Sequence, residues 1–157
     1  MTLTFQKHIR IILFTFVIGC DSERQNIDNP KKKFMDKNRF VSEHSFKDNL
    51  ENQLQRTPQT LSHLRAANVT SENELKLEFF FYTNSENKAG QLANELATLN
   101  YSVDHRLAAD SKTEYLITGW TNKIIMTDDQ LGKWTRDMCE LGYKYDCEFD
   151  GWGTQLE

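Results

Sequence analysis

The sequence predicts a single α+β domain in which helices alternate with the strands of an antiparallel sheet. Residues 74–83 alternate between apolar and polar side chains, which is the period of a half-buried strand. Residues 86–100 and 127–142 carry apolar side chains at helical spacing behind capping residues. With 157 residues, 38% of them hydrophobic, the chain has room for one packed core and not for two.

Residues 42–67 are expected to form two consecutive helices. Apolar side chains recur every four residues in the first part, at Phe46, Leu50 and Leu54. The pair Thr57-Pro58 is typical of a helix start, because threonine caps the amino end and proline fits the first turn. A second helix, with Leu61 and Leu64 on its apolar stripe, is therefore predicted to begin there.

The first strand is expected over residues 74–83, and a helix follows it. The inward side chains of the strand are Leu75, Leu77, Phe79 and Phe81, and those facing the other way are Glu74, Lys76 and Glu78. Thr83 and Glu86 have the spacing of a capping box, which opens a helix. Its inward face is predicted to hold Ala89, Leu92, Ala93, Leu96 and Ala97. Asn100 is expected to end it.

Two more strands and a second helix are predicted next. The first of these strands alternates at Tyr101, Val103, His105 and Leu107. A turn over residues 109–112 leads into the other strand, residues 113–120. Thr127 and Gln130 then repeat the capping box. The helix that follows is lined by Leu131, Trp134, Met138 and Leu141, and Gly142 is expected to end it.

The last strand is predicted from Tyr143 onward. One face carries Tyr143, Tyr145, Cys147 and Phe149, and the other carries Lys144, Asp146, Glu148 and Asp150. The elements then follow the order β-α-β-β-α-β, which is the order of the ferredoxin-like fold. In that fold both helices cover one face of a four-stranded antiparallel sheet, here preceded by the amino-terminal helices.

Close to its end, the chain carries the motif Asp150-Gly151-Trp152-Gly153-Thr154. Glycines on both sides of Trp152 permit a turn with positive φ that would fold the indole back onto the domain. This motif, together with residues 74–83 and 117–121, resembles the family of regulators of ribonuclease activity B (RraB), which are protein inhibitors of ribonuclease E. The resemblance covers residues 38–154. It implies the ferredoxin-like fold and a non-catalytic protein that binds the scaffold region of ribonuclease E.

Residues 1–19 are expected to be a lipoprotein-type signal peptide. Lys7 and Arg10 precede an apolar run of nine residues, which is too short to span a bilayer. The run ends in Val17-Ile18-Gly19-Cys20, which resembles a bacterial lipobox. In such signals the chain is cleaved before the cysteine, so Cys20 would carry the acyl chains that anchor the protein in the membrane.

Residues 20–37 are expected to be a flexible tether, because they hold little apolar surface to bury. Their basic run, Lys31-Lys32-Lys33, suits contact with anionic headgroups or a solvated linker. By resemblance to enterobacterial sorting rules, Asp21 favours the inner membrane, with the domain facing the periplasm. A translation start at Met35 would instead leave residues 38–157 as a cytoplasmic domain.

The chain carries a formal net charge of −4, and the loss of residues 1–19 would remove Lys7 and Arg10 and lower it to −6. An acidic domain does not suit nonspecific binding to nucleic acid, which depends on Lys and Arg contacts to phosphates. The charge suits a basic protein partner, or it serves solubility alone. Direct binding of nucleic acid is therefore not expected.

The sequence lacks the spacing of a catalytic or metal site. The four histidines have no second ligand nearby; they are His8, His44, His63 and His105. Asp146, Glu148 and Asp150 could hold calcium, although a solvated row of carboxylates is the commoner outcome. A glycine-rich phosphate loop, a nucleophile elbow and a Cys/His pair are all missing. We therefore expect a protein that is not an enzyme and needs no metal or cofactor.

Cys139 and Cys147 remain once Cys20 is assigned to the lipid anchor. One falls on the last predicted helix and the other on the core face of the last strand, within disulfide distance if the two elements pack together. An exported protein would meet oxidising conditions. We expect the pair to be joined in the exported form, and two small buried thiols are the alternative.

The polar face of the predicted sheet is the candidate binding surface. Phe80 and Tyr82 point away from the helices, with Trp120 expected beside them. Glu148 and Asp150 share this face. Aromatic side chains on such strands are typical of an RNA-recognition platform, but the basic surround of that platform is missing. The open interpretations are a protein-binding patch and burial beneath the amino-terminal helices.

Two functions are therefore expected from the sequence. The first is a non-catalytic regulator that binds a protein, by resemblance ribonuclease E. The alternative is a membrane-anchored envelope lipoprotein that uses the same domain to bind an unknown periplasmic partner. The two differ in their compartment, because ribonuclease E works in the cytoplasm.

Overall fold

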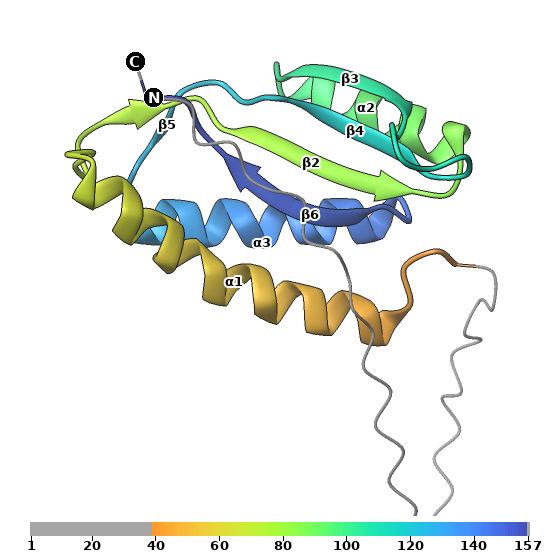
Figure 1. Cartoon of the computed structure of the whole chain (residues 1–157), viewed down its shortest axis with the longest axis horizontal. Helices are drawn as coiled ribbons and strands as arrows, with labels where there is room; N and C mark the ends of the chain where they lie inside the picture. The colour runs from red at the N-terminus through yellow and green to blue at the C-terminus, as the bar shows by residue number, and fades with distance from the viewer. Residues whose placement is uncertain (1–38, 157) are drawn as a thin grey trace, which may run out of the picture.

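The structure, a computed structural model, describes residues 39–156. The predicted signal peptide, the predicted lipidation site Cys20 and the predicted tether lie outside the described residues. In chain order (Figure 1) the elements are α1 (Glu43–Ala66), β1 (Glu74–Leu75), β2 (Glu78–Thr83), α2 (Glu86–Thr98), β3 (Ser102–Leu107), β4 (Tyr115–Trp120), β5 (Ile124–Ile125), α3 (Asp128–Lys144) and β6 (Glu148–Gly153).

Four strands form one antiparallel sheet in the order β3-β4-β2-β6. The short strands β1 and β5 pair separately, also antiparallel. Helix α2 connects β2 to β3, and α3 lies between β5 and β6 in the chain. The predicted α+β class and the predicted antiparallel sheet are therefore confirmed.

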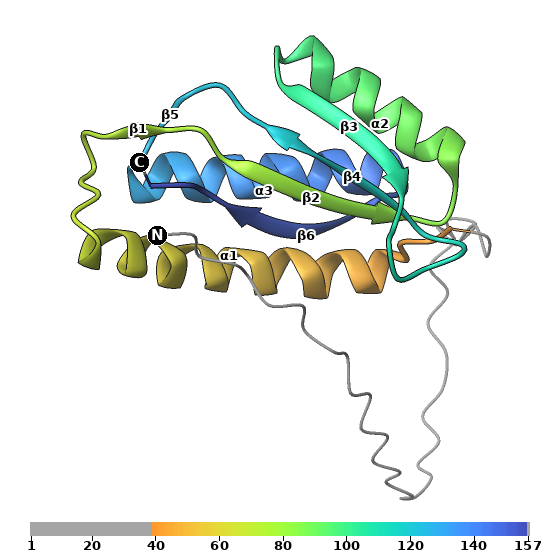
Figure 2. The ribbon, with the colours of Figure 1, turned by 45° about the horizontal axis from the view of Figure 1, so that its top comes forward.

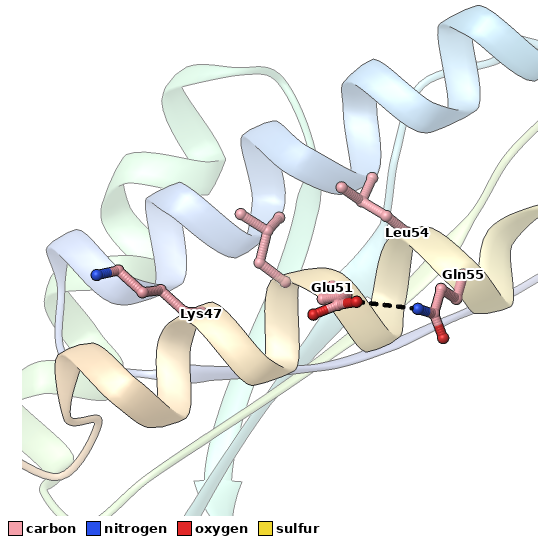
Figure 3. A pocket seen from close by; sticks show the side chains of 5 residues that line it. Lys47, Glu51, Leu54 and Gln55 are labelled. Atoms are coloured by element: carbon pink, nitrogen blue, oxygen red, sulfur yellow. Dashed lines mark hydrogen bonds between the residues drawn. The ribbon is translucent and has the colours of Figure 1, made fainter.

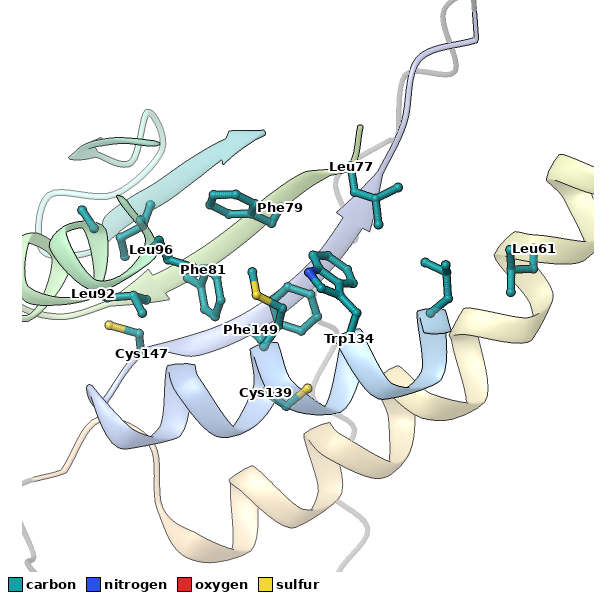
Figure 4. Close-up of a cluster of buried hydrophobic side chains, with 14 of the residues drawn as sticks. Leu61, Leu77, Phe79, Phe81, Leu92, Leu96, Trp134, Cys139, Cys147 and Phe149 are labelled. Carbon is teal, nitrogen blue, oxygen red and sulfur yellow. The ribbon is translucent and has the colours of Figure 1, made fainter. Parts of the chain in front are cut away.

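The core lies between one face of the four-stranded sheet and helices α2 and α3 (Figure 4). The inward strand residues Phe79, Phe81 and Phe149 are at most 1% exposed. The rings of Phe81 and Phe149 pack with centroids 5.0 Å apart. The two helices complete the core with buried side chains at Leu92, Leu96, Trp134 and Met138. Each such burial stabilises the fold by about 1.5–3 kcal/mol, which holds both helices to this face.

Helix α1 is one continuous helix that packs against α3 and lies beside β6 (Figures 1 and 2). Ser42 caps its amino end, where the Ser42 Oγ accepts the Ser45 N–H at 3.0 Å, and the helix passes through Pro58. The predicted second helix start at Thr57 is therefore wrong. Proline removes one helical amide, but Thr57 is buried against α3 and its Oγ1 donates to the Gln53 carbonyl oxygen at 3.0 Å. These contacts keep the helix intact through the proline.

Helix α2 begins later than predicted. Ser85 occupies the cap position, so the predicted capping box at Thr83 is wrong. Thr83 is the fully buried last residue of β2, and its Oγ1 donates to the Asp146 carbonyl oxygen at 3.0 Å. The predicted inward face is buried except for the exposed Ala97. Asn100 follows the helix with a φ of 59°, as expected of a residue that stops a helix.

Helix α3 begins at the predicted cap, where Thr127 Oγ1 accepts the Gln130 N–H at 3.3 Å. The prediction that Gly142 ends this helix is wrong, because the helix continues to Lys144. Asp146 makes the turn into β6 with a φ of 59°, a conformation that aspartate tolerates better than most residues. The helix therefore ends two residues beyond the glycine, and the residue with positive φ that follows it is Asp146.

Gly142 has a packing role inside α3. A Cβ at this position would lie 2.7 Å from the Cys147 carbonyl oxygen and 2.8 Å from the Phe81 ring. Because the chain is still helical at Tyr143 and Lys144, the last strand begins later than predicted, at Glu148. The predicted row of alternating polar residues from position 144 to 150 does not form.

The Gly-Trp-Gly motif lies within β6 and does not form the predicted turn. The register of β6 on β2 shifts by one residue at Asp150, which is a β-bulge. Gly151 has a φ of 135°, a conformation that favours glycine. Because of the extra residue, Phe149 and Trp152 both pack against the core although they are three positions apart.

Candidate functional site

The sheet surface opposite α2 and α3 is called here the open face. Side chains alternate along a strand, so the residues that point away from the core gather on it. Pairing between the strands places them side by side: Glu78, Phe80 and Tyr82 on β2, Leu116, Thr118 and Trp120 on β4, Ser102, Asp104 and Arg106 on β3, and Glu148 on β6. In Figure 1, β3 passes in front of α2 and β6 passes in front of α3, so the view is onto this face.

Three predicted binding residues, Phe80, Tyr82 and Trp120, come together on the open face, and each is half-buried. None of the three belongs to the hydrophobic core of residues 39–156. The alternative that α1 covers them does not hold. Phe46 of α1 stacks instead on Tyr143 of α3, with ring centroids 4.3 Å apart.

Thr118 lies among these aromatic side chains and was not singled out from the sequence. It pairs with Phe80 on one side and with Asp104 on the other. Only 9% of the residue is exposed, and its Oγ1 has no hydrogen-bond partner within the part of the chain that the structure describes. A buried hydroxyl without a partner costs about 1–3 kcal/mol. Alternation with Trp120 could have placed Thr118 on this face, but its unmet hydrogen bond depends on the sheet register.

Burial and nearby carboxylates raise the pKa of Tyr82, which lies on the open face. Burial raises the pKa of Tyr82, and the carboxylates of Asp150 and Glu114 raise this pKa further, whereas Arg106 lowers it. Asp150 is the exposed extra residue of the bulge, and Glu114 directly precedes β4. Arg106 is paired with a carboxylate, since its Nη1 donates to Asp104 Oδ2 at 2.6 Å. The surroundings of Tyr82 are therefore acidic.

The outer edge of β6 is covered by α1. The side-chain amides of Asn49 and Gln53 both donate to the Phe149 carbonyl oxygen, at 2.8 and 3.3 Å. These bonds satisfy a strand edge that would otherwise be open to pairing with another chain. Helix α1 thus protects the β6 edge of the sheet and leaves the open face uncovered.

Trp152 lies on the core side of β6. Its Nε1 donates to Thr57 Oγ1 at 3.4 Å, and its ring meets the Trp134 ring edge-on with centroids 6.2 Å apart. Thr154 Oγ1 donates to the Lys76 carbonyl oxygen at 2.8 Å. The aromatic part of the closing motif therefore joins α1, α3 and β6, and it does not contribute to the open face.

Asp146 forms a separate cluster, called here the clamp, with residues 39–41. Its carboxylate accepts the N–H groups of Phe40 and Val41 at 3.0 and 2.9 Å. Lys88 Nζ donates to it at 2.6 Å, and Arg39 Nε lies 3.4 Å from Oδ1. Burial acts to raise the pKa of Asp146, but the bonds from Lys88 and from the two backbone groups hold the pKa below its usual value.

Cys139 and Cys147 are free thiols, so the predicted disulfide is absent from the structure. Figure 4 shows the Cys147 sulfur directed toward Leu92 and the Cys139 sulfur directed toward α1. Burial raises the pKa of each thiol to about 12, so neither is a nucleophile at neutral pH. Across residues 39–156, His, Cys, Asp and Glu side chains form no group of three or more that could hold a metal ion.

A shallow hollow lies on the outer surface of α1 (Figure 3). Its described lining comes from this one helix, at Lys47, Leu50, Glu51, Leu54 and Gln55. The Gln55 amide donates to Glu51 Oε1 at 3.2 Å, so these two polar side chains bond to each other. The hollow therefore lacks the converging polar groups of an active site. No helix in the described range 39–156 has both the length and the apolar character needed to cross a membrane.

Similarity to known proteins is found at the level of a family. The chain matches no curated protein. Residues 54–154 match the sequence profile of the family described as regulator of ribonuclease activity B. The matched range begins within α1, includes every strand and the whole open face, and ends at Thr154 of the closing motif. Because the match covers more than half of the chain, the protein belongs to the RraB family.

Proposed function

We propose that the protein is a non-catalytic regulator that binds a ribonuclease, which by resemblance is ribonuclease E. The observation that carries this proposal is the match of residues 54–154 to the family of regulators of ribonuclease activity B. The chemistry of the open face agrees with it. This face offers aromatic rings and carboxylates, while the two described thiols are buried and protonated.

We also propose that β2, α2, β3, β4, α3 and β6 form a ferredoxin-like arrangement. Their order in the chain follows β-α-β-β-α-β, and the sheet order is β3-β4-β2-β6. In such an arrangement both helical connections cross the same face of the sheet. The other face is then available to a protein partner.

Capture of purified ribonuclease E by the full-length protein tests the proposed function. Two forms of the ribonuclease are compared, one with its scaffold region and one without it. We expect capture of the form that has the scaffold region, and slower cleavage of RNA by that form when the protein is added. If neither form is captured, the ribonuclease role is wrong.

The second candidate function is that of a lipid-anchored envelope protein, and the amino-terminal sequence supports it. We propose that residues 1–19 are a signal peptide, that Cys20 is acylated and that residues 20–37 are a tether. Lys7 and Arg10, the apolar run and the lipobox-like end of that run follow one another in register. The domain would then bind a periplasmic partner at the inner membrane.

Labelling of cells with a clickable palmitate tests this second candidate. The wild-type protein should take up the label and fractionate with membranes, and Cys20→Ala should abolish the labelling. A wild-type protein that stays unlabelled in the cytosolic fraction would contradict the anchor. That outcome would favour a translation start at Met35 and a cytoplasmic domain.

A further inference from the structure

We propose that two copies of the protein pair through strand β3, antiparallel and about a twofold axis at His105, so that their two sheets join into one. This inference goes beyond the proposed function and does not depend on it. It assigns an interface to an edge of the sheet that the proposed function leaves unused.

The two edges of the four-stranded sheet differ in what covers them. Helix α1 covers the β6 edge, where Asn49 and Gln53 donate to the Phe149 carbonyl oxygen. At the other edge, β3 pairs with β4 on one side, and no strand of residues 39–156 lies on its other side. Proteins usually block such an edge with proline, a bulge or charged side chains, lysine above all. Strand β3 has no proline, lysine or bulge, so another strand can pair with it.

The backbone groups that face the open edge belong to Val103, His105 and Leu107. The Ala108 N–H donates to the Glu114 carbonyl oxygen at 2.8 Å, at the end of the β3–β4 pairing. Bonded and non-bonded positions alternate along an antiparallel pair of strands. The even-numbered residues of β3 therefore bond to β4, and the odd-numbered residues direct their N–H and C=O groups outward. A second strand can bond to β3 only through these odd-numbered residues.

Charge selects one register among those that align the odd-numbered residues of two copies. Asp104 and Arg106 point to the same face of the sheet. With the axis at either of them, that side chain would face its own copy, and like charges directly opposite each other destabilise strand pairing. With the axis at His105, Asp104 faces the second copy's Arg106, and Arg106 faces the second copy's Asp104. An axis nearer either end of β3 would pair fewer of its six residues.

The bond that already joins Arg106 to Asp104 within one chain is compatible with this register. It runs from Arg106 Nη1 to Asp104 Oδ2 at 2.6 Å, so it uses one oxygen of the carboxylate and one nitrogen of the guanidinium. The remaining oxygen and the other guanidinium donors can bond across the edge. Both side chains are more than half exposed, at 58% for Arg106 and 65% for Asp104. Four charges of alternating sign would then surround the axis.

The helix side of β3 also suits a second copy. Val103 would lie opposite the second copy's Leu107, and Leu107 is 47% exposed in the single chain. Pairing would therefore cover an exposed apolar side chain. Helix α2 contacts β3 and β4 and lies behind them in Figure 1. Next to His105 it carries Gly90, where a Cβ would lie 3.8 Å from the His105 Nε2. Because glycine has no side chain, the two α2 helices can approach closely at the axis.

Sedimentation velocity tests the inference on the full-length protein with Cys20→Ala, which removes the predicted acylation site. We expect dimers that dissociate on dilution. Asp104→Arg alone, or Arg106→Asp alone, places like charges opposite each other at both symmetric positions and should weaken dimerisation at least about tenfold. A mixture of the two single variants should associate about as strongly as the wild type, because every charged pair across the edge is again opposite in sign.

A wild type that stays monomeric at high concentration, or a mixture of the two variants that does not associate, would overturn the inference. Asp137→Arg is the matched control. Asp137 forms an exposed pair with Lys133 on α3, away from the β3 edge, so this change of charge should leave dimerisation unchanged. A loss equal to that of Asp104→Arg would reflect net charge alone and would also overturn the inference.

Cysteine cross-linking measures the register in the same Cys20→Ala background. Cys139 and Cys147 are buried, so a new cysteine on β3 is the accessible thiol of the described residues. His105→Cys should form a disulfide-linked dimer under mild oxidation, because opposite residues of a bonded pair have Cα atoms about 5.5 Å apart, within disulfide reach.

Asp104→Cys is the control for the register. In the proposed dimer, residue 104 lies diagonal to its own copy, at about 7–8 Å, so it should cross-link at least about tenfold more slowly than His105→Cys. Faster cross-linking through Asp104→Cys would overturn the inference. No ribonuclease takes part in these measurements, so their outcome leaves the proposed function untouched.

Discussion

The carboxylate of Asp146 joins parts of the chain that are far apart in sequence. It accepts hydrogen bonds from the N–H groups of Phe40 and Val41 and from Lys88 Nζ on α2, while Asp146 itself lies in the turn from α3 into β6. Its φ of 59° lies in a region that Asn and Asp visit more readily than other residues with a Cβ. The position therefore requires both this backbone conformation and a short acceptor side chain.

Substitution of Asp146→Asn is expected to lower the free energy of unfolding by about 1–3 kcal/mol, because charge-assisted bonds to Lys88 and to two backbone N–H groups are weakened. Asparagine keeps the backbone preference, so the change isolates the charge. Urea denaturation at pH 7 measures the effect. Asp137→Asn is the control: Asp137 forms an exposed pair with Lys133, and its loss should cost at most about 0.5 kcal/mol.

The same variant has a defined pH dependence. The folded-state pKa of Asp146 lies below its usual value of 3.8, so the stabilisation is present above that value and is lost as pH falls through the folded pKa. The difference in stability between the wild type and Asp146→Asn should therefore narrow below about pH 4. A difference that stays constant down to pH 3 would show that the charge is not the cause.

The residues of the open face show which part of the site could be predicted from sequence. Period-two alternation alone decides that Phe80 and Tyr82 point away from the helices, and Trp120 follows the same rule on its own strand. The burial of the Thr118 hydroxyl without a hydrogen-bond partner among residues 39–156 could not be predicted, because a polar residue on a strand face is ordinary until its neighbours are known. The bulge at Asp150 likewise depends on pairing with β2.

At the scale of elements, the patterns predicted which segments are helices and strands, and tertiary contacts decided several boundaries. Thr57-Pro58 has the local signal of a helix start, yet burial of Thr57 against α3 carries α1 through it. Gly142 has the local signal of a helix end, yet it lies inside α3 because the chain packs closely there. In both cases the local rule predicted the wrong helix boundary, because packing against other parts of the chain decides where the helix continues.

Alanine substitutions at two glycines of α3 should change the stability of the protein in opposite directions. Gly142→Ala is expected to destabilise the protein by about 1–3 kcal/mol, because the new Cβ would meet the Cys147 carbonyl oxygen at 2.7 Å. Gly132→Ala should stabilise it by about 0.5–1 kcal/mol, since the new Cβ would have no described atom within 4 Å beyond its chain neighbours and the backbone of its own helix, and alanine favours the helix. Thermal unfolding of both variants measures whether each substitution raises or lowers the stability. Stabilisation by Gly142→Ala would refute the close approach.

At the scale of the whole molecule, the two faces of the sheet have different roles. One face is sealed by α2 and α3 around a core in which Phe79 and Phe81 are fully buried. The other presents half-buried aromatics and carboxylates over a continuous sheet. Because Cys139 and Cys147 are free thiols, the described domain depends on this single core for its stability.

The buried thiols should therefore report global unfolding. Cys139 and Cys147 are at most 2% exposed, and with a pKa of about 12 they hold almost no thiolate at pH 8. In a Cys20→Ala background, a chromogenic disulfide reagent should label neither thiol of the native protein and both after denaturation. Rapid labelling of the native protein would contradict the burial. Labelling of neither thiol in the denatured, unreduced protein would reveal a disulfide.

The clamp also sets the path of mechanical tension through the domain. The bonds from Phe40 and Val41 to Asp146 precede the first turn of α1. A pull on the amino end therefore strains the junction of α3 and β6 first, and α1 can peel away only after those bonds part. In single-molecule pulling, Asp146→Asn should lower the force of the first rupture, whereas an unchanged force would mean that tension enters through α1.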